Sequence, residues 1–228
     1  MRVYSAHYED DAHLTTIFDG GFKSIQTIGD TKDIPGILVL HGGSDISPSL
    51  YNEKTLPVTL ASKIPSQRDE MEMQLIKDFT ARKWPIFGIC RGMQMLTAAF
   101  GGKLLQHVSN HAGGDHRVSV MVRKSIENAT GKIQSFTDFA EFEVNSAHHQ
   151  MCVVRKIRDA EVTSWCTTPR SGVYVGASSP EDYDIEVEAV HFRPQNCYGV
   201  QWHPEWLKKD HVAVQWLLTE LSSKITRV

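Results

Sequence analysis

The segment Gly88–Gln94, with the sequence GICRGMQ, constrains the fold of this chain more than any other. It overlaps Trp84–Ile89, a short apolar run whose proline lies near its start, where a strand tolerates it. Beyond Cys90, side chains recur at helical spacing at Met93, Leu96, Thr97 and Phe100. Gly101-Gly102 then supplies a helix stop. We therefore predict a buried strand, a tight turn at Cys90 and a helix of about three turns.

The turn itself indicates a reactive thiol. Gly88 and Gly92 flank Cys90 at the spacing of the Gly-x-Ser-x-Gly nucleophile elbow, with cysteine in place of serine. The positive end of the following helix favours a thiolate, and we expect the charge of Arg91 to add to that field. The alternative is a buried, inert cysteine on a core strand, and this segment alone leaves both readings open.

A second motif lies near the end of the chain, where residues 198–205 read YGVQWHPE. We predict an apolar strand that delivers His203 and Glu205. Residues two apart in an extended segment point to the same side, so Glu205 is expected to bond one ring nitrogen of His203 and leave the other facing a thiol. Pro204 fixes this geometry and ends the strand. The alternative is a surface histidine beside a surface glutamate. The presence of the cysteine turn in the same chain argues against this alternative.

Together the two motifs resemble those of class I glutamine amidotransferases, whose triad runs Cys, His, Glu along the chain. Three more segments resemble the γ-glutamyl-γ-aminobutyrate hydrolase branch: residues 38–51 (LVLHGGSDISPSLY), 68–70 (RDE) and 144–150 (VNSAHHQ). The resemblance covers roughly residues 35–207. It implies an α/β, flavodoxin-like domain with a mostly parallel central sheet flanked by helices, and a smaller additional antiparallel region. We predict one such domain over residues 1–228.

The resemblance also implies an activity, the hydrolysis of a γ-glutamyl amide through a thioester on Cys90. His203 and Glu205 are then the other catalytic residues. Backbone N–H groups of Gly43 or its neighbour Gly42, and of Arg91, are expected to form the oxyanion hole, which stabilises the negative charge of the tetrahedral intermediate.

Substrate recognition is expected from the segment at residues 144–150, which is rich in hydrogen-bonding groups. The substrate-binding residues that we predict are Gly42, Gln94, Ser146, His148 and His149. Gln94 lies one helical turn beyond Cys90 and should face the same pocket. Adjacent histidines cannot both point one way in a strand, so one of His148 and His149 is expected to be structural.

The glycine loop departs from the pattern of the branch at two positions. His41 stands where proline is usual, and Ser44 stands where a third glycine is common. His41 either lines the pocket or is a solvated loop residue, and we expect the latter. This departure bears on the shape of the substrate pocket and leaves the nucleophile unaffected.

A competing pattern is a cluster that contains His107, His111, Asp115 and His116. The spacing of its first two histidines suits a metal site only in a helix, whereas Asn110 and Gly113-Gly114 favour a loop. We therefore expect a solvated or pocket-edge loop, with no metal and no cofactor.

Composition fits a cytoplasmic enzyme with a small-molecule substrate. The chain has 228 residues, 41% hydrophobic and 22% charged, with a formal net charge of -3. That length builds one substantial core, and the near-neutral charge argues against nucleic acid as a partner. The first residues carry acids rather than a signal sequence, and no apolar run is long enough for a membrane span. Four cysteines are few for a disulfide scaffold, so Cys152, Cys166 and Cys197 are expected to be buried packing residues.

Strand-like and helix-like segments alternate along the rest of the chain, as in α/β proteins. Strands are predicted at 3–5, 24–28 and 36–40, and helices at 71–79 and after Asp210, which we expect to be an N-cap. Apolar runs at 117–122, 142–144, 161–165 and 186–192 predict strands with one wet face. Residues 170–184 are predicted to form an exposed loop.

Three functions are compatible with these motifs. The first is a free-standing hydrolase of γ-glutamyl amides, and the second is a glutaminase subunit that delivers ammonia to a separate ligase. The third, a degenerate binding protein, is disfavoured by the intact Cys90, His203 and Glu205. The sequence leaves open the identity of the leaving amine and whether the chain forms a homodimer.

Overall fold

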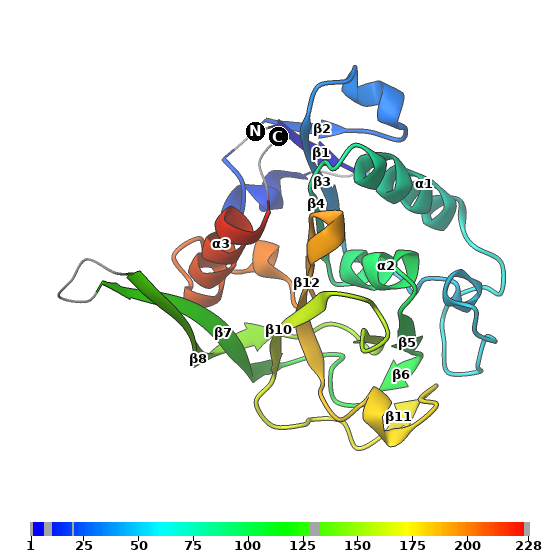
Figure 1. The fold of residues 1–228 in the computed structure, drawn as a ribbon. Helices are drawn as coiled ribbons and strands as arrows, with labels where there is room; N and C mark the ends of the chain where they lie inside the picture. Colours follow the sequence, from blue (N-terminus) through cyan, green and yellow to red (C-terminus); the bar gives the residue numbers. More distant parts are fainter. Residues whose placement is uncertain (1, 7–10, 20, 128–132, 226–228) are drawn as a thin grey trace.

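The computed structural model describes residues 2–6, 11–19, 21–127 and 133–225 (Figure 1). Its centre is a nine-stranded sheet in the order β2-β1-β3-β4-β13-β12-β10-β7-β8. The first five strands in this order run parallel: β2 (Phe22–Ser24), β1 (Arg2–Ser5), β3 (Gly36–Leu40), β4 (Ile86–Ile89) and β13 (Cys197–Val200). This parallel half confirms the predicted α/β class.

The sheet continues without a break into an antiparallel half. Its strands are β12 (Val187–Phe192), β10 (Ala160–Cys166), β7 (Asp115–Glu127) and β8 (Ile133–Asn145). Two small antiparallel sheets pair β5 (Lys103–Leu105) with β9 (Met151–Val153) and β6 (His107–Val108) with β11 (Tyr174–Val175). The antiparallel region that we predicted is thus mostly part of the central sheet.

Helices cover both faces of the parallel half (Figure 1). Helices α1 (Gln67–Ala81) and α2 (Arg91–Ala99) pack with Leu38 and Leu40 of β3, whereas α3 (Val212–Lys224) packs in the cluster that holds Ile37 and Val39. Neighbouring strand residues point to opposite faces, so one wholly apolar strand supports both layers. Short 3-10 helices complete the fold: η1 (Asp11–Thr16), η2 (Ile28–Thr31), η3 (Pro48–Tyr51), η4 (Pro180–Asp182), η5 (Arg193–Gln195) and η6 (Pro204–Trp206).

Three local predictions were wrong. Strand β12 is buried along its whole length and has no wet face, because Val190 and Phe192 pack in one core cluster and Ala189 packs in the other. The residue that caps α3 is His211, whose side chain accepts a hydrogen bond from the Ala213 amide, rather than Asp210. Strand β2 ends at Ser24, and Ile28 already begins η2.

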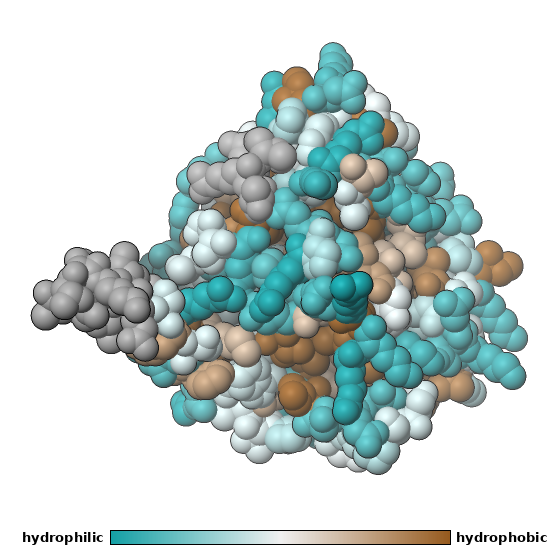
Figure 2. Space-filling view, in the orientation of Figure 1, coloured by the Kyte–Doolittle hydropathy of each residue, from teal (hydrophilic) through white to brown (hydrophobic). Residues whose placement is uncertain are grey.

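The face of the molecule in Figure 2 is mostly hydrophilic, with smaller apolar areas between the polar side chains. Among the helices of the described residues, none has both the length and the apolar character that crossing a bilayer requires.

Candidate active site

Cys90 lies on the turn between β4 and α2, in a backbone conformation that non-glycine residues rarely adopt. Its φ is 50° and its ψ is −106°. The strand side of the turn is fixed by a 2.7 Å hydrogen bond from the Cys90 amide to the Val200 carbonyl, and the helix side by one from the Gln94 amide to the Cys90 carbonyl. Such a strained residue at a strand-to-helix turn is the geometry of a nucleophile elbow.

The flanking glycines are required by contacts between backbones. A methyl group added at Gly92 would lie 2.2 Å from the Leu40 carbonyl oxygen, and one added at Gly88 would lie 2.5 Å from the carbonyl carbon of Gly92. Helix α2 therefore approaches β3 and β4 more closely than any side chain allows. This contact holds Cys90 at the end of the parallel strands.

His203 lies between Cys90 and Glu205. Its Nδ1 is 2.7 Å from Glu205 Oε1, and its Cε1 lies against Gly42, which also faces Cβ of Cys90. Burial alone would lower the pKa of His203, but the hydrogen bonds and charges of Cys90 and Glu205 outweigh it and raise the pKa to about 9. All three side chains are buried. The structure thus brings the three predicted catalytic residues together.

The backbone reason that we expected for this arrangement was wrong. Strand β13 ends at Val200, and His203 is the N-cap of η6, with φ −107° and ψ 86°. Glu205 reaches the imidazole through a turn of 3-10 helix rather than along an extended strand. Pro204 begins this turn, where its fixed φ suits the first helical position.

Three further residues position this group, and none of them was among the predicted site residues. Asn145 holds the backbone of His203 through two 2.8 Å hydrogen bonds, because its Oδ1 accepts one from the His203 amide and its Nδ2 donates one to the His203 carbonyl. Trp206 stacks on the His203 ring with centroids 3.8 Å apart. Gln201 Nε2 donates to the sulfur of Cys90 at 3.5 Å. All three lie within or beside the quoted motifs, which was the available signal.

The Gly42-Gly43 loop lies against the reactive pair. A methyl group at Gly42 would lie 2.7 Å from Cε1 of His203 and 3.6 Å from Cβ of Cys90, and Gly43 has a φ of 148°. The guanidinium of Arg68 accounts for the shape of the loop, because it donates to the carbonyls of His41 and Gly42. We still predict that the backbone amides of Gly43 and Arg91 donate hydrogen bonds to the oxyanion of the tetrahedral intermediate.

We had expected the charge of Arg91 to add to the electric field at Cys90, and this prediction was wrong. The Arg91 side chain is buried and forms ion pairs with Asp69 and Glu72 of α1. Two carboxylates surround the guanidinium, and Glu72 is shared with Arg68. The charge is therefore compensated locally, and its effect is to fix α1 against α2.

The predicted substrate-binding residues fall into two groups. Gln94 lies beside the thiol, since its Nε2 is 3.3 Å from Oε1 of Gln201. His149 is half-buried, and its Nε2 is 2.9 Å from Oδ1 of Asp45. Ser146 and His148 instead serve the protein interior: the Ser146 hydroxyl donates to the His111 carbonyl, and His148 Nδ1 to the Gln150 carbonyl.

Two histidine predictions were wrong because strand pairing buries loops that look polar in sequence. His41 is only 8% exposed, and its Nε2 lies 2.8 Å from the Ser5 hydroxyl of the neighbouring strand β1. His111 and His116 are also buried rather than solvated. They face Glu186 and Glu188, which are distant in sequence. The other two members of the sequence cluster lie elsewhere, since Asp115 is exposed and His107 pairs with His149.

The fold and the site define a class I glutamine amidotransferase-like protein. A crystal structure of a glutamine amidotransferase from Thermotoga maritima matches the fold with a TM-score of 0.53 at 16% identity, covering 97% of this chain and 83% of that one. A family model described as Peptidase C26 matches residues 26–205. The chain therefore belongs to the Peptidase C26 family.

Curated relatives agree with this membership. The chain is 31% identical over 178 residues to Protein NtpR of Enterococcus hirae, across 74% of this chain and 66% of that protein. It is 30% identical over 195 residues to the gamma-glutamyl-gamma-aminobutyrate hydrolase of Escherichia coli O157:H7, across 78% of this chain and 66% of that protein. The chain thus matches just under two thirds of the length of both relatives.

Proposed function

We propose that this chain hydrolyses γ-glutamyl amide bonds through a γ-glutamyl thioester on Cys90. One observation carries the proposal: a cysteine on a strained strand-to-helix turn lies beside His203, which Glu205 orients from 2.7 Å. A thiol, a base and a group that orients the base are the minimum for nucleophilic acyl transfer.

In the first half of the reaction, the sulfur of Cys90 attacks the γ-carbonyl carbon and forms a C–S bond. The carbonyl π electrons move to oxygen, and the amides of Gly43 and Arg91 stabilise the resulting oxyanion. As the intermediate collapses, the C–N bond breaks and His203 donates its proton to the leaving amine. The raised pKa of His203 keeps that proton on the ring at neutral pH.

In the second half, His203 removes a proton from water, and the hydroxide attacks the thioester carbonyl. The C–S bond then breaks, glutamate leaves, and the proton returns to the Cys90–His203 pair. Glu205 stabilises the imidazolium in both halves, because its carboxylate stays bonded to Nδ1.

The γ-glutamyl specificity is supported by the resemblance to the hydrolase branch and by the polar groups beside the thiol. The amides of Gln94 and Gln201 are suitable partners for the charged α-amino and α-carboxyl groups of the substrate.

A second function, a glutaminase subunit that delivers ammonia to a separate ligase, is supported by the resemblance of the Cys90 and His203 motifs to those of class I glutamine amidotransferases. The two functions differ in whether the chain works alone. The purified chain should therefore be offered glutamine and a panel of γ-glutamyl amines without a partner. Amine release from the panel supports the hydrolase, and weak glutaminase activity with no amine release supports the subunit.

The same assay tests the nucleophile. We predict that Cys90→Ala abolishes turnover while the circular dichroism spectrum stays unchanged. Cys197→Ser is the matched control, because this thiol is buried on β13 and bonds the Gln195 carbonyl, which a hydroxyl can also do. Turnover by purified Cys90→Ala would exclude the proposed chemistry.

A further inference from the structure

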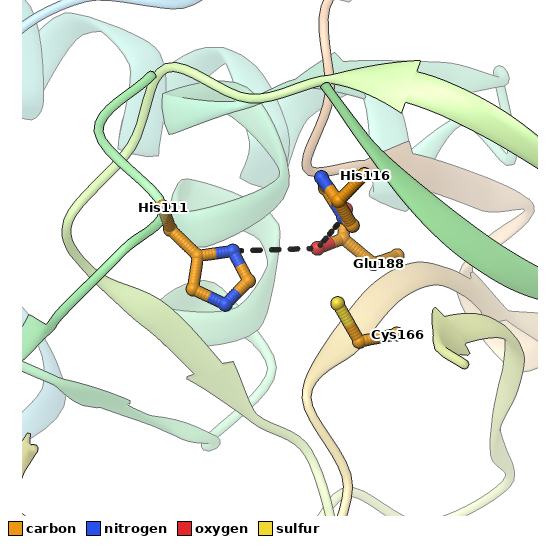
Figure 3. A group of neighbouring side chains, drawn as sticks. All are labelled: His111, His116, Cys166 and Glu188. Carbon is orange, nitrogen blue, oxygen red and sulfur yellow. Dashed lines mark hydrogen bonds and ion pairs between the residues drawn. The ribbon is translucent and has the colours of Figure 1, made fainter. Parts of the chain in front are cut away.

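A second cluster of reactive side chains lies within the antiparallel half of the sheet (Figure 3). His111 comes from the loop after β6, His116 from β7, Cys166 from the end of β10 and Glu188 from β12. One nitrogen, sulfur or oxygen of each lies within 4.8 Å of the others, and all four residues are buried. The proposed thioester chemistry uses none of them.

The cluster contains polar atoms without a hydrogen-bond partner among the described residues. These include Nδ1 of His111, Nδ1 of His116 and Oε2 of Glu188. A buried polar atom left unsatisfied costs about 1–3 kcal/mol. Of these atoms, Nδ1 of His111 lies against the Glu188 carboxylate, and an unpaired nitrogen there indicates that the site lacks a component that the protein's own groups do not supply.

The tautomer of His111 follows from its other neighbour. Its Nε2 is 3.1 Å from Oε2 of Glu186, and an acidic oxygen requires the N–H at that position. Nδ1 then carries a lone pair, and it lies 3.9 Å from Oε1 of Glu188. Figure 3 shows this nitrogen directed at the carboxylate.

His148 repeats this arrangement from another direction. Its Nδ1 bonds the Gln150 carbonyl and must donate, so Nε2 carries a lone pair, which lies 3.9 Å from the same Glu188 oxygen. Two imidazole lone pairs thus face one buried carboxylate. This electron-rich centre calls for a cation.

We propose that His111, His116, Cys166 and Glu188 bind a zinc ion. Zinc accepts nitrogen, sulfur and oxygen ligands in a tetrahedron, whereas magnesium and calcium take oxygen ligands. Zinc with a Cys166 thiolate, a Glu188 carboxylate and two neutral imidazoles has no net charge, which suits a buried site. Four protein ligands leave no open position, so the ion has a structural role.

The donors lie near this geometry, and those that are farthest apart, within 4.8 Å, have to draw together when the ion binds. Zn–N and Zn–O bonds of about 2.0 Å give neighbouring ligand atoms about 3.3 Å apart in a tetrahedron. The observed distances from Oε1 of Glu188 are 2.9 Å to Nε2 of His116 and 3.9 Å to Nδ1 of His111, which bracket that value. On binding, the Cys166 thiol releases its proton to solvent, and the His116 ring proton moves from Nε2 to Nδ1.

The outer contacts of the cluster also match those of metal sites. A histidine ligand commonly donates its other ring N–H to a carboxylate that is itself held in place. Glu186 does this for His111, and it accepts hydrogen bonds from the amides of Arg170 and Ser171 and the hydroxyl of Tyr174. Strand β11, which begins at Tyr174, is thereby connected to the proposed ion.

The ion would stabilise the segment beside the reactive thiol. The His111 carbonyl accepts hydrogen bonds from the Ser146 hydroxyl and the His148 amide, at 2.7 and 2.9 Å. The Glu188 carbonyl accepts one from the amide of Gln201, whose side chain reaches Cys90. Fixing His111 and Glu188 therefore fixes residues on both sides of the candidate active site.

The test uses the full chain without a histidine tag, produced in minimal medium with added zinc and dialysed against a chelator. Inductively coupled plasma mass spectrometry should find about one zinc per chain. Protein produced with cobalt in place of zinc should show tetrahedral d–d bands and a thiolate-to-cobalt charge-transfer band. These two readouts on the unaltered chain do not depend on how a variant folds.

Variants then assign the ligands. Cys166→Ser should lose the charge-transfer band, whereas Cys197→Ser, which alters a buried thiol outside the cluster, should keep it. Glu186→Gln should weaken zinc binding by about 10–100-fold, as expected for an outer contact of a ligand. Unaltered protein that retains no zinc and shows no cobalt bands would overturn the proposal, and so would a charge-transfer band that persists in Cys166→Ser.

Discussion

At the residue scale, the proton on His203 decides what the candidate active site can do. Burial opposes the charged imidazole, but the contacts with Cys90 and Glu205 raise the pKa of His203 to about 9. The imidazolium is therefore present below that pH and is lost as the pH rises through it. Because the leaving amine needs this proton, we predict that kcat/KM falls above about pH 9.

Replacing Glu205 by glutamine tests the cause of this fall in kcat/KM at alkaline pH. The variant lacks the carboxylate that stabilises the imidazolium at 2.7 Å, so the alkaline limb of kcat/KM should move to lower pH. At neutral pH the loss should be smaller than the roughly 10²–10⁴-fold that a general acid–base contributes, because His203 itself remains. A pH profile of Glu205→Gln that superimposes on that of the unaltered chain contradicts this role.

Individual residues differed in how far the sequence could place them. Cys90, His203 and Glu205 carry their own local signals, a glycine-flanked turn and a His-Pro-Glu run, and the structure brings them together. His41 and His111 carry no such signal. Their burial depends on Ser5 and Glu186, which reach them only after distant strands pair.

At the scale of the elements, the contact between α2 and β3 holds the reactive turn. Gly92→Ala would place a methyl group 2.2 Å from the Leu40 carbonyl oxygen, and backbone on both sides has to move. We predict a loss of about 1–3 kcal/mol in the free energy of unfolding, measured by urea denaturation, together with a loss of activity.

The matched control is Gly29→Ala in η2, where the nearest atom, Oγ1 of Thr27, is 3.6 Å away. This exposed position should change stability by no more than about 0.5 kcal/mol. Equal effects of the two substitutions would mean that the close approach at Gly92 does not constrain the turn.

Elements with strong local patterns were predictable, and elements set by pairing were not. Strand β3 has the predicted bounds Gly36–Leu40, since an apolar run of only five residues is too short for a helix and suits a strand covered on both faces. The hairpin of β7 and β8 extends over 13 residues in each strand, well beyond the predicted 117–122 and 142–144. Its outer pairs follow the register of the inner ones, and their side chains show little apolar alternation.

At the scale of the whole molecule, strand β12 carries a titratable histidine that should lower the free energy of unfolding in acid. His191 on β12 is buried near Glu161 and Lys224. Burial, reinforced by the charge of Lys224, lowers the pKa of His191 to about 4, although Glu161 acts in the opposite direction. The unfolded chain therefore binds a proton near pH 6.5 that the folded chain takes up only near pH 4.

This difference gives a signed prediction. The contribution of neutral His191 to the free energy of unfolding is fully present above about pH 6.5. It is lost as the pH falls towards 4, and the loss reaches up to about 3 kcal/mol. His191→Gln cannot titrate, so its free energy of unfolding should fall less between pH 7 and pH 4.5 in urea denaturation. Glu161 stays ionised through this window, because its salt bridges lower its pKa to about 2. Identical pH slopes for the two proteins contradict the assignment.

The resemblance of separate motifs was enough to predict the α/β class, because those motifs lie at the ends of β3, β4 and β13. It did not reveal that the parallel strands continue directly into the antiparallel ones, a matter of edge pairing between β13 and β12. The buried cluster around Glu188 arises from that continuation, since its members come from β7, β10, β12 and the loop after β6.

The central claim is that Cys90 carries the γ-glutamyl group during turnover, and intact-protein mass spectrometry after rapid acid quench tests it most directly. With a γ-glutamyl amide as substrate, the chain should gain the mass of one γ-glutamyl group. Peptide mapping should place it on Cys90, and Cys90→Ala should show no gain. Turnover without any adduct on Cys90, or an adduct on Cys152, Cys166 or Cys197, would contradict the account.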